Sequence, residues 1–87
     1  MEYWELYAKR IRELSQKRKL SINKLAGMCG LNQSTLDNIM RGVSKSPGVI
    51  TIHKIANAFN MTPAEFLDFK ELNEFSFDDN ETEEKKR

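Results

Sequence analysis

The sequence has little of what enzymes, secreted proteins and membrane proteins usually need. It holds one cysteine and one histidine among 87 residues, so it cannot form an internal disulfide or supply four Cys or His ligands to a structural zinc ion. No apolar run approaches the ~20 residues that a membrane-spanning helix requires. We therefore expect no metal, no cofactor and no membrane contact, and we expect a reducing compartment, the cytoplasm.

Catalytic patterns are missing as well. The chain has no glycine-rich phosphate loop, and no nucleophile, base and orienting group stand at a spacing that would support catalysis. Residues 1–7 carry two acids and no basic side chain, which does not fit a signal peptide. We predict that the chain is not an enzyme and that it has no small-molecule substrate.

The charge is nearly balanced overall, at +1, but it is unevenly distributed. Residues 1–60 hold ten Lys or Arg and four Asp or Glu, a net charge of +6, whereas residues 61–87 hold four and nine, a net charge of −5. The length suits one domain with one modest core. We place a single domain at residues 1–75 and a charged tail at residues 76–87, which we expect to be disordered.

Residues 21–41 predict two short helices joined by a tight turn. Ser21 suits the first helix start, because its hydroxyl can accept a free backbone N–H. Gly30 ends that helix, since glycine adopts the left-handed conformation without a Cβ penalty, and Asn32 caps the next helix. Apolar positions at helical spacing are Leu25, Ala26, Met28, Cys29, Leu36 and Ile39. This pattern is typical of a helix-turn-helix.

Three more helices follow from hydrophobic spacing and capping residues. The first runs from about Glu2 to Lys19. Its apolar stripe comprises Trp4, Tyr7, Ile11 and Leu14. Residues 42–50 are expected to form a loop, after which Thr51 caps a fourth helix. A capping box of Thr62 and Glu65, with Pro63 in the first turn, begins a fifth that fades near residues 72–75.

This order of elements resembles the phage-repressor-type helix-turn-helix, the Cro-like or XRE-type DNA-binding domains. The matching positions are Leu25, Ala26, Gly30, Leu36, Ile39, Gly42, Pro47, Ile52–Phe59 and Thr62–Leu67. The resemblance covers residues 11–67 and implies an all-α, five-helix repressor-like fold. It also implies a sequence-specific DNA-binding regulator, a repressor that acts as a homodimer on a palindromic operator.

The second central helix carries the candidate base-reading residues. Gln and Asn side chains can form a bidentate pair with adenine, and residues four apart share a helix face. We predict base contacts from Gln33, Ser34 and Asn38, and the resemblance adds Asn32. Asp37 is expected to form an i,i+4 ion pair with Arg41. The alternative for each polar side chain is an ordinary solvated face.

The first turns of both central helices contain no acid, which is unusual because the positive end of a helix dipole favours carboxylates. Exposed N–H groups without a nearby carboxylate suit a phosphate. The resemblance further implies that the loop after the second helix touches the DNA backbone. The predicted phosphate-binding residues are Ser21, Ile22 (through its backbone N–H), Lys24, Arg41, Ser44, Lys45, Ser46 and Lys17.

Aromatic residues gather in the two end segments of the domain, which we expect to lie close together. They form either additional core or a dimer interface. The interface candidates are Tyr3, Trp4, Phe69 and Phe75. The partners implied are double-stranded DNA at the nucleoid and a second copy of the chain. An alternative function is an antitoxin or other protein-interaction module that binds DNA and uses its C-terminal segment to bind a partner.

Overall fold

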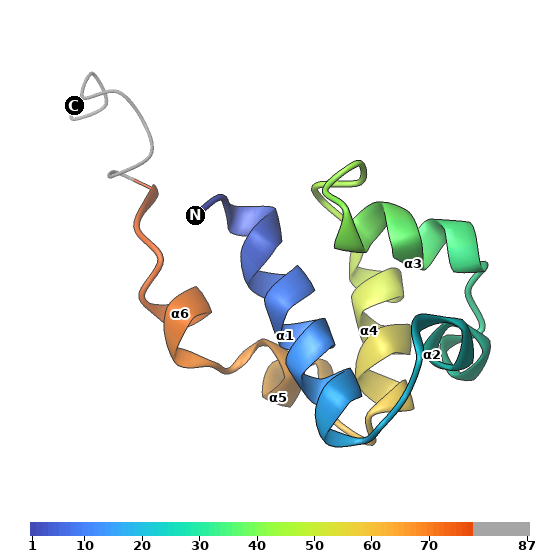
Figure 1. Ribbon diagram of the computed structural model, residues 1–87. Helices are drawn as coiled ribbons and strands as arrows, with labels where there is room; N and C mark the ends of the chain where they lie inside the picture. Colours follow the sequence, from blue (N-terminus) through green and yellow to red (C-terminus); the bar gives the residue numbers. More distant parts are fainter. Residues whose placement is uncertain (78–87) are drawn as a thin grey trace.

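The computed structural model describes residues 1–77, which contain six helices and no strand (Figure 1). The helices are α1 Tyr3–Lys17, α2 Ile22–Cys29, α3 Gln33–Met40, α4 Val49–Ala58, α5 Pro63–Leu67 and α6 Lys70–Asn73. Helix α2 packs against α3 and α4, and α6 lies beside α1. The predicted all-α class is therefore confirmed, with six helices in place of five.

A single hydrophobic core joins the first five helices. Its fully buried large side chains are Ile11, Leu25, Leu36, Ile39, Ile55, Phe59 and Phe66. These residues come from the apolar stripes that the sequence predicts, so the stripes face one another as expected. Met28 is the exception: its side chain is 50% exposed, because the buried face of α2 passes through Leu25, Ala26 and Cys29.

Local capping fixes several helix ends as predicted. The Ser21 hydroxyl accepts the Lys24 N–H at 3.1 Å, and Gly30 takes the left-handed conformation with φ of 72°. Thr62 and Glu65 form the reciprocal capping box, with hydrogen bonds of 3.0 and 2.9 Å. Asn32 stands at the N-cap position of α3, but its side chain makes no capping hydrogen bond.

Three predicted boundaries were wrong. Helix α1 ends at Lys17, because Lys19 turns into the left-handed region at φ of 57°. Helix α4 begins at Val49, and the carbonyl of Gly48, not that of Thr51, accepts the first helical bond, from Ile52 at 3.1 Å. The fifth predicted helix is broken after Leu67, because Asp68 is non-helical and Phe69 is extended, and α6 follows.

Two arginines stabilise the fold: Arg10 in α1 and Arg18, which directly follows this helix. Arg18 donates to the carbonyl of Phe59 and lies over its ring, with 5.4 Å between the guanidinium carbon and the ring centroid. Arg10 donates to the carbonyls of Phe66 and Glu65 at 2.9 and 3.0 Å. The Phe59 and Phe66 carbonyls lie at helix ends, where backbone acceptors lack intrahelical partners, whereas the Glu65 carbonyl also accepts the Asp68 N–H at 3.2 Å. Part of the basic charge of residues 1–60 therefore stabilises the domain.

Most of the proposed C-terminal tail lies outside the described residues. The structure describes Ser76 and Phe77, and the Phe77 ring stacks on Tyr3 with 5.5 Å between centroids. The predictions of disorder and of a protein partner at the C-terminal segment depend mainly on residues 78–87, so they stay predictions.

Cys29 lies in the core, as predicted, and burial raises the pKa of its thiol. In the unfolded chain a cysteine titrates near ~8.5, so the folded state keeps its proton where the unfolded state loses it. The free energy of unfolding should therefore decrease as pH rises above about 8.5. Urea unfolding between pH 7 and 9.5 measures this decrease. Cys29→Ala should flatten it, and an equally steep decrease in that variant would contradict the assignment.

Candidate nucleic-acid interface

The turn between α2 and α3 sets the relative orientation of these two helices. The N–H groups of Gly30 and Leu31 donate to the carbonyls of Gly27 and Ala26 at 3.2 and 3.0 Å, which closes the end of α2. Leu31 is half-buried against the core and anchors the turn. Helix α3 then starts in a new direction with its first turn at the surface (Figure 1).

Helix α3 has one face in the core and the opposite face open. Leu36 and Ile39 are 0% and 1% exposed. The four predicted base-reading residues lie away from these two side chains: Asn32, Gln33 and Ser34 are exposed, and Asn38 is half-buried. The structure therefore brings all four together on or just before α3, with hydrophobic packing behind them.

The predicted ion pair between Asp37 and Arg41 does not form within the described residues. Arg41 instead donates through Nη2 to Oδ1 of Asn38 at 3.4 Å. Residues three apart also lie on the same side of a helix, so Asn38 is as accessible to Arg41 as Asp37 is. The contact turns the Asn38 carbonyl oxygen toward Arg41 and leaves its NH₂ group as a donor.

The start of α2 keeps the acid-free character that the sequence shows. Its first turn holds no acidic residue, and neither does that of α3. Ser21 and Lys24 are exposed, and Ile22 is half-buried against the core. The Ser21 hydroxyl already takes the Lys24 N–H. The N–H groups of Ile22 and Asn23, which have no intrahelical acceptor, remain for an anion.

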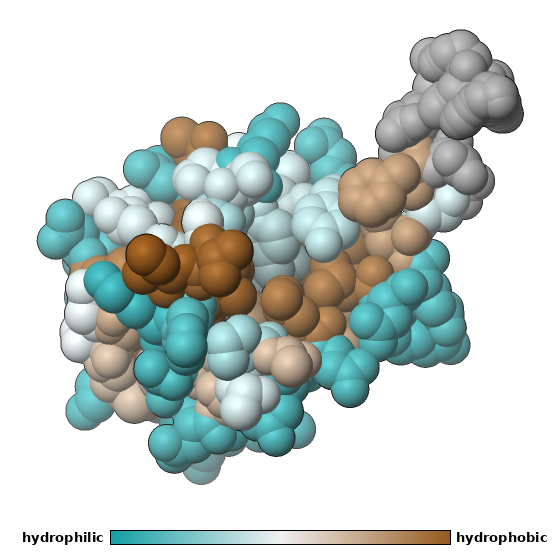
Figure 2. Space-filling view, turned by 180° about the vertical axis from the view of Figure 1, so that it is seen from behind, coloured by the Kyte–Doolittle hydropathy of each residue, from teal (hydrophilic) through white to brown (hydrophobic). Residues whose placement is uncertain are grey.

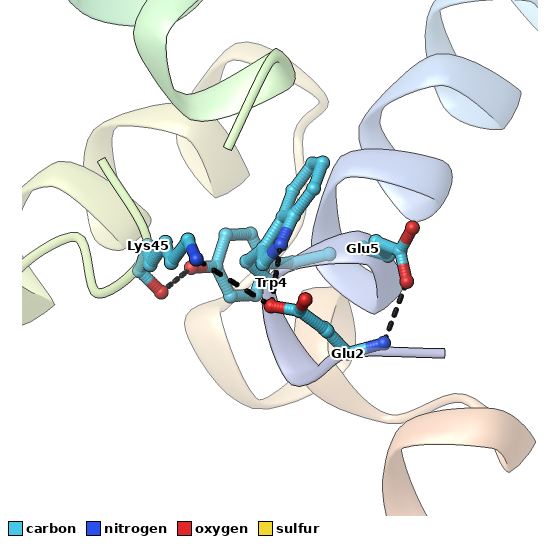
Figure 3. Close-up of polar contacts among 5 residues, drawn as sticks. Glu2, Trp4, Glu5 and Lys45 are labelled. Carbon is cyan, nitrogen blue, oxygen red and sulfur yellow. Dashed lines mark hydrogen bonds and ion pairs between the residues drawn. The ribbon is translucent and has the colours of Figure 1, made fainter. Parts of the chain in front are cut away.

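The α3–α4 loop, residues 41–48, is held in place by the N-terminal turns of α1 (Figure 3). The Tyr7 hydroxyl donates to the backbone carbonyl of Lys45, 38 residues away in the chain. Burial raises the pKa of Tyr7, and neighbouring Tyr3 adds to the rise. The hydroxyl therefore keeps its proton and stays a donor at neutral pH.

The side chains of the α3–α4 loop are placed differently from one another. Lys45 and Ser46 are exposed, Arg41 is exposed at the end of α3, and Ser44 is half-buried. The Lys45 ammonium also lies 3.6 Å from Oε1 of Glu2. Lys17, the remaining phosphate candidate, is exposed in the last turn of α1, at the opposite end of that helix from the loop.

Gly42 of the loop lies directly against the Trp4 indole of α1. Gly42 is buried at φ of 80°, and a Cβ built on it would lie 2.5 to 2.8 Å from three atoms of the Trp4 indole. Only glycine satisfies both the left-handed backbone and this close approach. Trp4 belongs to the apolar stripe predicted for residues 2–19, but no sequence pattern indicates its contact with Gly42.

Replacing Gly42 with Ala should reduce the free energy of unfolding by about 2 kcal/mol or more, because the left-handed backbone is strained and the indole must move. Urea denaturation followed by circular dichroism measures the loss. Gly48→Ala is the matched control, since a Cβ there meets open space at φ of −71°. Equal stability of the two variants would show that the Trp4 contact does not constrain the loop.

The aromatic candidates for a dimer interface are largely engaged inside the protomer. Trp4 packs on Gly42, and Phe69 lies under Arg10, with 5.0 Å from the guanidinium carbon to the ring centroid. Tyr3 contacts Phe75 edge-on at 5.1 Å between ring centroids. The two end segments therefore do lie side by side, as predicted.

Other apolar side chains remain open and were not predicted as a site. Val43, Val49 and Ile50 are 65%, 80% and 74% exposed. In the sequence, Val49 and Ile50 form an aliphatic pair directly after Gly48. Because α4 was predicted to start at Thr51, this pair was assigned to the preceding loop. Val43 lies in the same α3–α4 loop as Lys45, and Val49 and Ile50 directly follow this loop.

The described residues hold few other candidate sites. Within residues 1–77, no group of three or more His, Cys, Asp or Glu side chains is arranged to hold a metal ion. In the same part of the chain, no helix combines the length and the apolar character needed to cross a membrane.

The helix-turn-helix with an open polar face on its second helix defines a class of DNA-binding domain. Comparison with known families agrees, because residues 10–71 match the model of the Cro/C1-type HTH DNA-binding domain. The chain belongs to this family of DNA-binding regulators.

One solved structure similar to this chain is described as the crystal structure of the prophage Lp1 protein 11. It is 35% identical in sequence, with a TM-score of 0.73, and the match covers 83% of this chain and 95% of that chain. Among curated proteins, none matches the sequence.

Proposed function

We propose that this chain is a sequence-specific transcriptional repressor that binds a palindromic operator as a homodimer, in the cytoplasm at the nucleoid. The observation that carries the proposal is the division of α3 into two faces. Leu36 and Ile39 are buried, while Gln33 and Ser34 point to solvent. A helix anchored in this way can enter the major groove with its N-terminal residues first.

The exposed amides supply the base-reading chemistry. Gln33 can donate to and accept from an adenine, which presents N6 and N7 in the major groove. Asn38, whose Oδ1 is engaged by Arg41 at 3.4 Å, offers its NH₂ group to an acceptor such as a purine N7. Asn32 and Ser34 flank Gln33 and can bond bases or the adjacent sugar–phosphate.

Phosphate contacts on both sides of α3 would fix its register. On one side are the first N–H groups of α2 with Ser21 and Lys24, and on the other are Ser44, Lys45 and Ser46 of the α3–α4 loop. Arg41 lies at the end of α3, and Lys17 stands four residues before Ser21. Such contacts release counterions from DNA, so binding should weaken steeply as salt increases.

Gln33→Ala and Asn38→Ala should each weaken operator binding by about 1–3 kcal/mol and relax the base preference at the contacted position. The operator is first obtained by selecting bound duplexes from a random pool at physiological salt, and each variant is then passed through the same selection. Asn57→Ala, an exposed position on α4, is the matched control and should leave the consensus unchanged. Parent-like affinity and consensus in both α3 variants would refute the recognition-helix assignment.

Two recognition helices of a dimer read half-sites about 34 Å apart, and we propose a dimer contact near the α3–α4 loop. Val43 is exposed within this loop, and the exposed Val49 and Ile50 directly follow it. A hollow of about 170 Å³ adjoins the same loop, and it is lined by Tyr3, Tyr7, Lys45, Ser46, Pro47, Ile52 and Leu67. Figure 2 shows hydrophobic side chains gathered across this side of the molecule. We propose that a second copy of the chain binds to this surface, which has Tyr3 and Phe75 at its margin.

Ile50→Glu should shift the chain from dimer to monomer, because a carboxylate would be buried in the contact without a partner. Sedimentation velocity measures the oligomeric state, and DNA titration compares a full palindrome with a half-site. Met28→Glu adds the same charge at another exposed apolar position and should preserve the dimer. An Ile50→Glu variant that sediments as the parent does would place the dimer contact elsewhere.

A further inference from the structure

One carboxylate oxygen at the start of α1 is shared by two donors from different parts of the chain. Oε1 of Glu2 accepts the indole Nε1–H of Trp4 at 3.1 Å and lies 3.6 Å from the Lys45 ammonium (Figure 3). Lys45 is one of the residues proposed above to bind a phosphate. In the free protein, the Glu2 carboxylate therefore pairs with the ammonium group that would contact a DNA phosphate.

The backbone and the side chain of Lys45 are held by different partners. Its carbonyl accepts the Tyr7 hydroxyl, so the loop stays in place whatever the ammonium does. The ion pair itself is open to water, with the Lys45 and Glu2 side chains 63% and 66% exposed. Exposed pairs of this kind are weak, so a phosphate in the strong field of DNA can replace the carboxylate.

The Glu2 side chain serves the start of α1 as a hydrogen-bond acceptor, in a reciprocal capping box with Glu5. The Glu2 N–H donates to Oε1 of Glu5 at 2.6 Å, and the Trp4 indole is packed on Gly42. Neither contact uses the negative charge of Glu2. A glutamine at position 2 keeps an oxygen that can accept from the indole and loses only the charge.

We propose that Glu2 is a positioning residue that acts through Lys45: it holds the ammonium beside the α3–α4 loop in the free protein and competes with DNA phosphate for it. The proposal depends on the proposed function, since it needs Lys45 to meet a phosphate. Its consequence is a lower affinity for every duplex, because each binding event must first break the pair between Glu2 and Lys45.

The test compares the affinity of Glu2→Gln with that of the parent for the selected operator and for an unrelated duplex. Loss of the pair should tighten binding to both by about two- to five-fold, the range expected for an exposed ion pair. Glu13→Gln is the matched control, because it removes the same negative charge elsewhere on α1, where Glu13 lies 4.0 Å from Lys9 and not near the loop. It should tighten binding less.

A double-mutant cycle separates competition for Lys45 from general repulsion. In the Lys45→Met background, Glu2→Gln should have no more effect than Glu13→Gln. Equal tightening in the presence and absence of Lys45 would show that Glu2 repels DNA without acting through the lysine, and would overturn the proposal.

Trp4 gives an independent readout, since it is the one tryptophan of the chain and its indole bonds the same oxygen. When Lys45 moves to a phosphate, the carboxylate next to the indole loses its compensating charge, and the emission should shift. The shift on adding operator should be present in the parent and absent in Glu2→Gln and Lys45→Met. An equal shift in all three proteins contradicts the proposal.

The outcomes separate the two levels of inference. If the parent protein enriches no duplex sequence over the random pool, the proposed function is refuted. A parent that binds its operator, together with a Glu2→Gln variant no tighter than Glu13→Gln, refutes only the role of Glu2.

Discussion

The burial of Leu25, Leu36 and Ile39 is the constraint on which the helix-turn-helix depends. Helices α2 and α3 have eight residues each, and isolated helices shorter than ~12–15 residues are marginal in water. Each of these side chains is at most 1% exposed, and burying one fully contributes about 1.5–3 kcal/mol. Packing therefore holds α3 in place, which leaves its opposite face free to carry polar side chains.

A second layer of contacts extends this rigidity to the loop beyond α3. Trp4 packs on Gly42, and Tyr7 bonds the Lys45 carbonyl, so the N-terminal turns of α1 support the segment that follows α3. The first turn of α2 holds no acidic residue, and in the proposed function this turn and the loop would supply the phosphate contacts. Phosphate contacts orient such a domain, and the face between them reads bases. The chain belongs to the Cro/C1-type family of HTH DNA-binding domains.

Much of the fold could be predicted from the sequence because its signals are local. The spacing of Leu36 and Ile39 identified the buried face of α3, and Gly30 and Thr62 marked helix ends through their own backbone chemistry. The exposed positions of Gln33 and Ser34 follow directly from that spacing.

Contacts between distant segments could not be predicted in this way. The contacts of Tyr7 with Lys45 and of Trp4 with Gly42 depend on how α1 crosses the domain. The hydrophobic periodicity of the sequence does not indicate this crossing. Predictions also failed where two residues close in sequence could each make the same local contact. Arg41 could reach either Asp37 or Asn38 and contacts Asn38, while Gly48 rather than Thr51 is the N-cap of α4. As a result, the exposed Val49 and Ile50 were missed.

The most direct measurement is an NMR titration of the ¹⁵N-labelled chain with its selected operator duplex. If the polar face of α3 lies in the groove with phosphates on both sides, the largest amide shifts should fall on residues 21–24, 32–38 and 43–46. Residues 53–58 of α4 should move little. Large shifts on α4 with an undisturbed α3 would contradict the account.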